Sequence, residues 1–326
     1  MDIGSAMMEN AMRGNASPRN KTLSLTGEEE EKYSANIFDL SMSIDNTALE
    51  FQSIENRIIN ADLFGVLPRL PSAFADLVII DPPYNLDKDF HGNGFRARST
   101  EEYSSYVESW LPAVLSCAKP HASIYVCCDW KSSSAIFSAL EKKCIVRNRI
   151  TWQREKGRGA AHNWKNCSED IWFATMGEDY TYNVGAVMHR KKVIAPYREN
   201  GEPKDWTETE DGKFRLTHPS NFWDDITVPY WSMSENTEHP TQKPEKLVAK
   251  LILASSNPGE LVFDPFGGSG TSAVTAKKLG RRYTCIEQNR TYCLWAEKRL
   301  DRVKNGDLAI QGYSDGVFRE RNSGSK

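Results

Sequence analysis

A short apolar run, residues 77–80, leads directly into the tetrapeptide Asp81-Pro82-Pro83-Tyr84. The two prolines fix φ and lack N–H groups, so the carbonyls around them are free to accept hydrogen bonds from a ligand. Tyr84 offers the face of its ring, and Asp81 offers a full negative charge. A planar ring that bears an amino group suits this set, and a nucleobase turned out of a duplex has that form. On these residues alone, a prolyl turn without a ligand is the alternative.

A second apolar run, residues 261–263, is followed by Asp264-Pro265-Phe266-Gly267-Gly268-Ser269-Gly270-Thr271 and then by a helical stretch, residues 272–279. Strand, glycine-rich turn and helix form an arrangement that lets backbone approach a nucleotide-like ligand closely. The spacing differs from the GxGxxG dinucleotide fingerprint, and no lysine follows the glycines as it does in a phosphate-binding loop. The loop therefore binds another nucleotide-like ligand or merely turns the chain.

Together the two segments resemble the signature motifs of the amino-group DNA methyltransferases that use S-adenosylmethionine. In that family the first motif is catalytic and the second binds the cofactor. The cofactor motif here follows about 180 residues after the catalytic one, an order that resembles the β group of the family. Three further segments extend the likeness: His239-Pro240-Thr241-Gln242-Lys243-Pro244, Glu287 after residues 283–286, and Asp62 after residues 58–61. The resemblance covers most of the chain from about residue 57 to 300.

The resemblance implies a role for each of these residues. It gives catalysis to Asp81, Pro82, Pro83 and Tyr84. It gives cofactor binding to Asp62, Asp81, His239, Thr241, Gln242, Lys243, Asp264, Pro265, Phe266, Gly268, Ser269, Gly270, Thr271 and Glu287. Lys243 would neutralise the methionine carboxylate of the cofactor. Glu287 would accept hydrogen bonds from the ribose hydroxyls of the cofactor, and Asp62 would lie near its adenine ring. No metal is expected.

The amine of adenine or cytosine is a weak nucleophile, because its lone pair is delocalised into the ring. Hydrogen bonds from its N–H groups to Asp81 and to the Pro82 carbonyl would favour a pyramidal nitrogen. Transfer is then an in-line displacement in which positioning matters most, and negative oxygen near the developing ammonium is favourable. Tyr84 would stack on the flipped base, which contributes about 1–3 kcal/mol.

Several other classes of protein compete with this prediction. Methylation of cytosine N4 is the nearest, but Asp at the first position of the tetrapeptide resembles the adenine enzymes more. Methylation of cytosine C5 needs a cysteine nucleophile, and the chain has no Pro-Cys dipeptide. In methyltransferases of RNA or of protein glutamine, the motif that resembles the cofactor motif comes before the tetrapeptide, which is the opposite of the order in this chain. A DNA-binding module without turnover would have degenerate motifs, and an oxidoreductase would carry GxGxxG. We therefore predict site-specific methylation of the N6 amine of a flipped adenine in duplex DNA.

Composition sets broad limits on the protein. The chain has 326 residues, a formal net charge of −3 and seven cysteines without a CxxC pair. It shows no apolar run of membrane-spanning length and no secretory signal at its start, so a reduced, cytoplasmic location is expected. Adjacent Cys127 and Cys128 are expected to be buried at a strand end.

Basic residues are concentrated in one part of the chain. Residues 131–198 hold 13 Lys and Arg against 6 Asp and Glu, a local net charge of 13 − 6 = +7. Such a segment suits a surface that meets phosphates, although a solvated basic face is the simpler alternative. The residues expected to contact DNA are Arg96, Arg98, Arg158, Lys165, Arg190, Lys191 and Lys192. The loop 85–99 would become ordered only on DNA, or would be a mobile surface loop.

Short apolar runs alternate with helical stretches from residue 57 onward. Strands are expected at 57–60, 76–80, 122–128, 144–152, 171–176, 260–263 and 282–286. Helices are expected at 64–70, 101–118, 132–142, 244–255, 270–280 and 289–303. Alternation of this kind predicts an α/β fold with a mostly parallel, doubly wound sheet, which the resemblance makes a Rossmann-like methyltransferase fold. Ligands bind beyond the carboxyl ends of such strands, where Asp81 and Asp264 both lie.

The two ends and one internal segment depart from this alternation. Residues 1–50 are expected to form a tail whose first 25 or so residues are disordered. Residues 51–312 would form the catalytic domain, with a target-recognition insertion at about 183–235, and residues 313–326 a frayed tail. The expected partner is double-stranded DNA. The resemblance favours a homodimer, and a cognate restriction endonuclease is an open alternative to an orphan enzyme.

Overall fold

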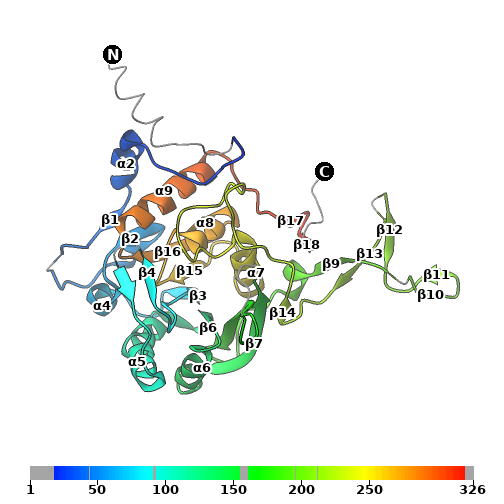
Figure 1. The fold of residues 1–326 in the computed structure, drawn as a ribbon, viewed down its shortest axis with the longest axis horizontal. Helices are drawn as coiled ribbons and strands as arrows, with labels where there is room; N and C mark the ends of the chain where they lie inside the picture. The colour runs from blue at the N-terminus through cyan, green and yellow to red at the C-terminus, as the bar shows by residue number, and fades with distance from the viewer. Residues whose placement is uncertain are drawn as a thin grey trace, which may run out of the picture.

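The computed structural model describes residues 18–319 apart from 44, 91–92, 155–160, 195 and 211. At its centre is a sheet with the strand order β1-β2-β16-β15-β3-β6-β8-β7-β14 (Figure 1). Its strands are β1 Phe38–Asp39, β2 Arg57–Asn60, β3 Ala75–Ile80, β6 Ala118–Cys128, β7 Ile145–Gln153, β8 Ser168–Thr175, β14 Phe222–Trp223, β15 Leu261–Asp264 and β16 Arg282–Glu287. Neighbouring strands are parallel except at β8, which is antiparallel to both β6 and β7. The predicted mostly parallel α/β sheet is confirmed.

Helices cover both faces of this sheet. One face carries α3 Phe51–Ile54, α4 Leu63–Val66, the 3-10 helix η1 Leu67–Arg69, α5 Thr100–Ser116 and α6 Ser133–Glu141. The other carries α7 Glu245–Ser255, α8 Thr271–Lys278 and α9 Arg290–Lys304, and α2 Gly27–Ser34 packs on α9. The doubly wound arrangement follows from the parallel sheet, since both of its faces must be covered.

Strand β3 shows how the chain builds two apolar cores. All of its residues are buried. Leu77 and Ile79 pack in the core beneath α7, α8 and α9, whereas Val78 and Ile80 pack in the core beneath α5 and α6. Alternate side chains of a strand point to opposite faces of the sheet, so a continuous apolar run predicts burial on both faces. Asp81, the next residue, therefore emerges at the carboxyl edge of the sheet.

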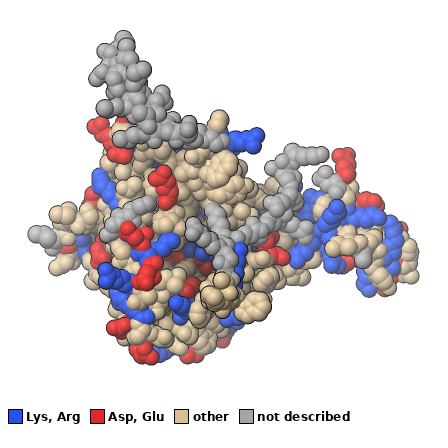
Figure 2. Space-filling view, viewed as in Figure 1, with Lys and Arg blue, Asp and Glu red and all other residues tan. Residues whose placement is uncertain are grey.

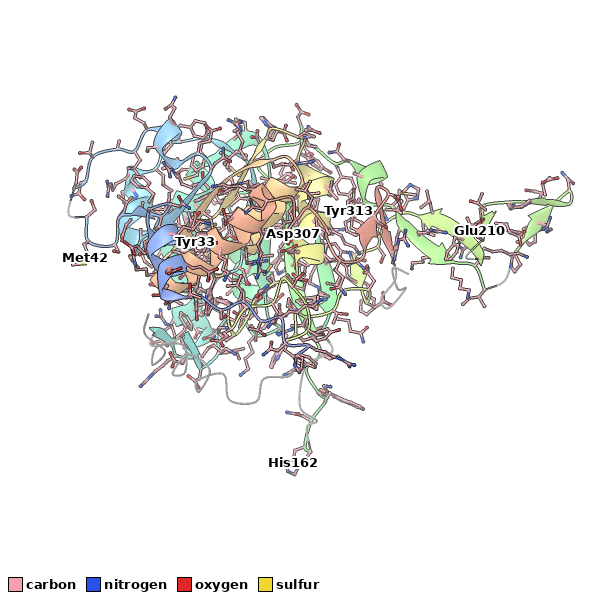
Figure 3. The ribbon with its side chains drawn as sticks, turned by 90° about the horizontal axis from the view of Figure 1, so that it is seen from above. Tyr33, Met42, His162, Glu210, Asp307 and Tyr313 are labelled. Atoms are coloured by element: carbon pink, nitrogen blue, oxygen red, sulfur yellow. The ribbon has the colours of Figure 1, made fainter. Side chains whose placement is uncertain are left out.

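Residues 189–217 form an arm that projects from the body (Figure 1). The 3-10 helix η2 Val184–Val187 leads into β9 His189–Lys192, β10 Arg198–Glu199, β11 Glu202–Pro203, β12 Thr207–Thr209 and β13 Gly212–Thr217. Figure 3 shows Glu210 on the arm, away from the body. The segment at about 183–235, where an insertion was expected, thus contains antiparallel strands, and β14 within it returns to the central sheet beside β7.

The C-terminal segment differs from the expected frayed tail. Strands β17 Tyr313–Ser314 and β18 Val317–Arg319 join the sheet of the arm, in the order β12-β13-β9-β18-β17. Phe318 is fully buried, and Lys246 of α7 donates to the Arg319 carbonyl at 2.6 Å. One buried ring in a polar segment has no periodicity, so the pattern did not indicate these strands. The expected fraying is wrong for residues 313–319.

The N-terminal segment also differs from the expectation where the structure describes it. Leu23 is only 2% exposed and packs with Tyr292 and Trp295 of α9. Helix α2 begins with a capping box between Thr26 and Glu29, and β1 extends the central sheet. The expected disorder is wrong for residues 18–25, while residues 1–17 lie outside the described part of the chain.

The segment after the tetrapeptide is ordered in the free protein. Strands β4 Lys88–Phe90 and β5 Asn93–Phe95 pair as a hairpin. Asn85 closes its base, donating to the Arg98 carbonyl at 3.0 Å and accepting from the Arg98 amide at 2.7 Å. The loop 85–99 therefore has a defined structure without DNA, apart from residues 91–92, which are not described. None of the helices in the described ranges has the length and apolarity that a membrane crossing requires.

Candidate active site

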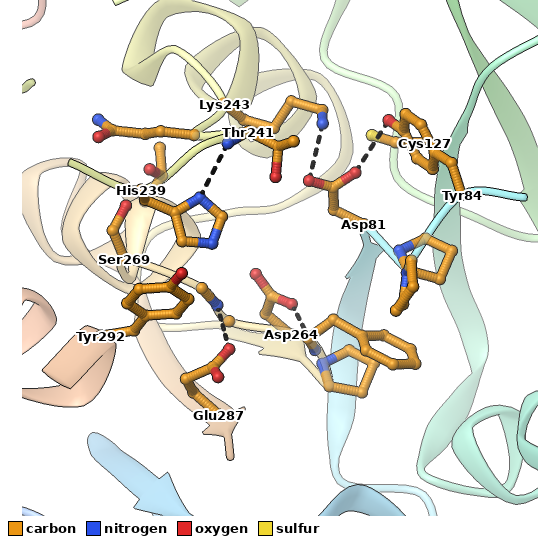
Figure 4. Close-up of a pocket in the computed structure, with 18 of the residues that line it drawn as sticks. Asp81, Tyr84, Cys127, His239, Thr241, Lys243, Asp264, Ser269, Glu287 and Tyr292 are labelled. Atoms are coloured by element: carbon orange, nitrogen blue, oxygen red, sulfur yellow. Dashed lines mark hydrogen bonds and ion pairs between the residues drawn. The ribbon is translucent and has the colours of Figure 1, made fainter. Parts of the chain in front are cut away.

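The two sequence motifs meet in one cavity of about 370 Å³ at the carboxyl edge of the central sheet (Figure 4). Tyr84, which follows β3, and Phe266, which follows β15, both line this cavity. The lining includes every predicted catalytic residue and every predicted cofactor residue except Gly270. A cavity of this size is in the range that holds a small ligand. Parallel neighbours in the sheet bring these loops together, because β3 and β15 are adjacent strands that end at the same edge.

Asp81 is held from two directions. Its Oδ1 accepts a hydrogen bond from the Tyr84 hydroxyl at 3.0 Å, and its Oδ2 lies 2.7 Å from the Lys243 ammonium. Asp81 keeps 21% of its side chain exposed, whereas Lys243 keeps 9%. In this structure Lys243 is thus bound to the Asp81 carboxylate. Its predicted contact with a methionine carboxylate stays a prediction.

Glu169 completes this group and was not identified from the sequence. Its Oε2 accepts from the Tyr84 hydroxyl at 3.1 Å and lies 3.4 Å from the Lys243 ammonium, and its Oε1 forms an ion pair with Arg154. The reason is topological. Because β8 is antiparallel, its first residues lie at the edge where the parallel strands end. Alternation with buried Ile171 and Phe173 was the available signal for the face on which Glu169 lies.

Burial and charge alter the pKa values of this group. Burial raises the pKa of Asp81 above its ordinary value, and Glu169 adds to the rise while Lys243 opposes it. Burial favours the neutral form of Lys243, but Asp81 and Glu169 outweigh it and raise the lysine pKa above its usual range. Burial also raises the pKa of the Tyr84 hydroxyl well above its ordinary value. Lys243 is therefore a cation, and Tyr84 a neutral donor, at physiological pH.

The glycine-rich turn is packed too tightly for side chains. Gly268 has φ +51°, and a Cβ there would lie 3.0 Å from Nε2 of His239. Gly270, the residue that precedes α8, has φ +76°, and a Cβ there would lie 2.4 Å from that of Ala296 in α9. Both glycines therefore have the left-handed conformation that disfavours side chains. Gly270 does not line the cavity and instead lets α8 and α9 approach each other.

Glu287 and Asp264 bring two carboxyl groups to the same cavity. Glu287 accepts from the backbone amides of Gly268 at 2.8 Å and Asn289 at 2.7 Å, and burial raises its pKa to about 7. Asp264 accepts from the amide of Phe266 at 3.0 Å, and burial raises its pKa to about 7. Each oxygen of Glu287 retains a second lone pair for a ligand hydroxyl. These buried acceptors suit an uncharged polar donor such as a ribose diol.

The segment from His239 to Lys243 forms the opposite wall of the cavity. The amide of Thr241 donates to Nδ1 of His239 at 3.3 Å, and the His239 ring meets Tyr292 edge-on at 4.5 Å. The Gln242 side chain is engaged within this wall, where its Nε2 donates to the Glu235 carbonyl at 2.7 Å. On the far side, Asp62 caps the start of α4 by accepting from the Gly65 amide at 3.2 Å.

The predicted DNA-contacting residues fall into separate places. Arg98 lines the cavity and lies over the rings of Phe95 and Tyr106, and exposed Arg96 is on the same connection. Lys165 is exposed in the β7–β8 connection, which projects from the body near the labelled His162 (Figure 3). Arg158 lies outside the described residues.

Strand β9 of the projecting arm carries the remaining three predicted contacts, Arg190, Lys191 and Lys192. Lys and Arg side chains gather along this arm in the space-filling view (Figure 2). Pairing within the arm consumes part of its charge, since Lys204, Lys213 and Arg215 form ion pairs with carboxylates of the same segment. Arg190, Lys191 and Lys192 thus lie on the arm and do not line the cavity.

An α/β fold with a carboxylate-proline-proline-tyrosine turn and a glycine-rich turn in one cavity defines a nucleotide-dependent enzyme that handles an amino-bearing ring. The DNA methylase family profile matches residues 75–298, and the chain belongs to this family. Among curated proteins it is 33% identical over 256 residues to the type II methyltransferase M.HpaI of Haemophilus parainfluenzae, covering 78% of this chain and 76% of the relative. It is 31% identical over 251 residues to the DNA adenine methyltransferase YhdJ of Escherichia coli K12, covering 75% and 82% respectively.

Solved structures show the same fold at lower identity. The M1.HpyAVI–SAM complex superposes with a TM-score of 0.52 at 22% identity, covering 75% of this chain and 98% of the other. The cytosine-N4-specific PvuII DNA methyltransferase superposes with a TM-score of 0.54 at 15% identity, covering 77% and 92%. The predictions of a DNA methyltransferase, a Rossmann-like fold and S-adenosylmethionine as cofactor are confirmed.

Proposed function

We propose that this DNA methyltransferase transfers a methyl group to the N6 amine of adenine in duplex DNA at a specific site. The observation that carries the proposal is the position of Asp81, which faces the same cavity as the glycine-rich turn. The tetrapeptide begins with Asp, which resembles the adenine enzymes, and the relative YhdJ is named a DNA adenine methyltransferase. Methylation of cytosine N4 is the second candidate, because the same acceptor geometry would hold that amine.

The catalytic residues act by positioning the amine. Asp81 and the Pro82 carbonyl accept hydrogen bonds from its two N–H groups. This arrangement turns the nitrogen lone pair toward the methyl donor. S-adenosylmethionine supplies the methyl as a sulfonium and leaves as a neutral thioether, with the electron pair of the broken bond on sulfur. The methylated nitrogen then loses one proton, which Asp81 accepts as its hydrogen-bond partner. The Tyr103 hydroxyl donates to the Pro83 carbonyl at 3.0 Å, which holds the turn in place during these events.

Cofactor binding falls to the walls around the glycine-rich turn. Glu287 accepts the ribose hydroxyls with the lone pairs that its backbone donors leave open. Gly268 has no side chain, so the cofactor can approach its backbone closely. A Cβ there would lie against His239. Asp62 and Phe266 line the remaining wall. These roles rest on the fit between buried acceptors and a nucleoside with hydroxyl donors.

DNA is met by the basic residues around the cavity and on the arm. Arg98 lines the cavity and Arg96 is exposed on the same connection, so we assign both to phosphates next to the flipped base. Strands β9 and β13 pair in the projecting arm, and Arg190, Lys191 and Lys192 on β9 supply charge for phosphates. This arm occupies the predicted target-recognition insertion. The domain boundaries of the sequence prediction stay predictions.

The surroundings of the enzyme follow from its substrate. We place the enzyme in the cytoplasm, because its substrate is DNA. The family resemblance favours a homodimer. The relative M.HpaI is named a type II methyltransferase, and this favours a cognate restriction endonuclease over an orphan enzyme.

The test is mass spectrometry of nucleosides from duplex DNA after reaction with labelled S-adenosylmethionine. N6-methyladenine is the expected product, and N4-methylcytosine as the only product would overturn the adenine assignment. Asp81→Ala should abolish transfer while calorimetry still detects cofactor binding, because Lys243 keeps Glu169 as a partner at 3.4 Å. Turnover by this variant at the wild-type rate would contradict the role of Asp81. Sequencing of the modified positions then gives the recognition site.

A further inference from the structure

Glu169 is a buried carboxylate beside the reacting group, and no part of the catalytic motif contains it. Its side chain is only 6% exposed. The register pairs Cys128, the last residue of β6, with Asp170, so Glu169 lies one position beyond the end of that strand. A buried carboxylate is costly unless charged and hydrogen-bonded partners satisfy it. Here those partners are Arg154, Lys243 and the Tyr84 hydroxyl.

Glu169 and Asp81 compete for the same two donors. The Tyr84 hydroxyl lies 3.0 Å from Asp81 and 3.1 Å from Glu169, and its single proton can be donated to only one of them at a time. The Lys243 ammonium lies 2.7 Å from Asp81 and 3.4 Å from Glu169. Each donor that now occupies Asp81 therefore has a second acceptor within reach.

Asp81 holds two donors that methyl transfer does not use. In the free enzyme each of its oxygens accepts one hydrogen bond, from Tyr84 or from Lys243, so the target amine has to share an oxygen with one of these donors unless that donor moves away. A cation held against Asp81 also weakens its electrostatic support for the amine, which gains positive charge as the new N–C bond forms. A small rotation of the Lys243 side chain toward Glu169 would remove both obstacles.

We propose that Glu169 is a positioning residue for methyl transfer, which takes Lys243 and the Tyr84 hydroxyl from Asp81 when the target amine binds. The exchange moves no proton and breaks no covalent bond. It keeps Lys243 paired throughout, so no buried charge is left without a partner. Arg154 holds the other oxygen of Glu169 and so fixes the carboxylate in the position from which it can receive Lys243. This inference rests on the proposed role of Asp81.

The test is Glu169→Gln, which keeps the shape of the side chain and an acceptor for Tyr84 but removes the charge that attracts Lys243. Single-turnover kinetics on duplex DNA should show a rate about 10- to 100-fold lower, as for other partners that orient catalytic groups. The cofactor dissociation constant should change by less than about 3-fold, since the defect lies in the exchange at Asp81. A wild-type rate, or a loss confined to cofactor affinity, would overturn the proposal.

The pH profile separates this role from a structural one. Removing the Glu169 charge should lower the pKa of Asp81, so the acidic limb of the rate profile should move to lower pH. The other charged or titratable groups around Asp81, which are Lys243, Tyr84, Cys127 and Asp264, are unchanged in this variant. An acidic limb at the wild-type position would count against the proposal.

A matched control is Asp170→Asn, which removes a neighbouring carboxylate of β8 whose partners, Thr151, Ser133 and Arg149, do not line the cavity. It should keep the wild-type rate and pH profile. If Glu169→Gln does not fold, Glu169→Asp decides the matter. It keeps the charge but withdraws it by one methylene, so the rate should fall while the acidic limb stays in place, and a full rate would refute the idea. Absence of transfer by the wild-type enzyme in the same assay would instead refute the proposed function.

Discussion

Gly270 and Ala296 lie so close that a Cβ added to the glycine would come within 2.4 Å of the alanine Cβ. This contact sets how near α8 and α9 approach, and thereby where the glycine-rich turn meets Glu287. Gly270→Ala should lower the free energy of unfolding by about 2–4 kcal/mol, because overpacking adds to the cost of the left-handed backbone. Chemical denaturation measures this loss.

Gly280→Ala is the matched control for this variant. Gly280 has φ +74°, nearly the value at Gly270, but no atom of the described residues lies within 4 Å of the place that a Cβ would occupy. It should lose only about 1–2 kcal/mol, the cost of the left-handed conformation alone. Equal losses in the two variants would show that the contact with Ala296 does not restrict the helices.

Glu287 should make the stability of the cofactor-free enzyme depend on pH. Its pKa is raised from 4.5 to about 7 in the folded protein, so folding favours its protonated form. Its contribution is therefore fully present below about pH 4.5 and is lost as the pH rises through about 7. Glu287→Gln removes this dependence. The Tm of the wild type should therefore fall relative to that of the variant between pH 5 and pH 8.

An exposed carboxylate provides the control for that experiment. Glu101→Gln on α5 should leave the difference from wild type unchanged over the same pH range, since Glu101 is exposed. A Glu287 variant whose difference from wild type stays constant with pH would contradict the raised pKa.

The C-terminal strands should be needed for the stability of the whole domain. Phe318 of β18 is fully buried and packs with Val187, Leu253 and Ile310. Phe318→Ala should cost about 3–5 kcal/mol, the usual loss for a buried ring, and urea unfolding measures it. Leu308→Ala, at a side chain that is 59% exposed, should cost little, and a similar loss there would indicate a nonspecific effect.

The arm should contribute charge to DNA binding without touching the cofactor. Replacing Arg190, Lys191 and Lys192 by alanine should weaken DNA binding. It should also flatten the dependence of log K on log salt by about 0.9 for each residue that meets a phosphate. Fluorescence anisotropy over a salt series measures both, and calorimetry should show unchanged cofactor affinity.

Lys142→Ala serves as the control for the arm. This lysine follows α6, is 59% exposed and pairs with Glu108 of α5, so it tests the loss of a surface charge far from the arm in sequence. An unchanged salt slope in the arm variant would exclude β9 from the DNA interface.

The central sheet and most of the cavity could be predicted from the sequence. The strands predicted at 76–80 and 260–263 and the helices that follow them are found within a few residues of their expected ends. Their signals are local: apolar runs, prolines and glycines constrain the backbone over a few residues. Asp81 and Glu287 were identifiable for the same reason, because each directly follows or ends an apolar strand.

Which charged side chains come into contact could be seen only in the folded protein. Glu169 reaches Asp81 because β8 runs antiparallel, and strand direction depends on pairing between distant segments. Lys243 lies at Asp81 because the wall after β14 folds back over the sheet edge. Leu23 and Phe318 were missed because one buried side chain in a polar segment carries no periodicity. Burial, ion pairing and register are properties of contacts between segments, so no local pattern of residues specifies them.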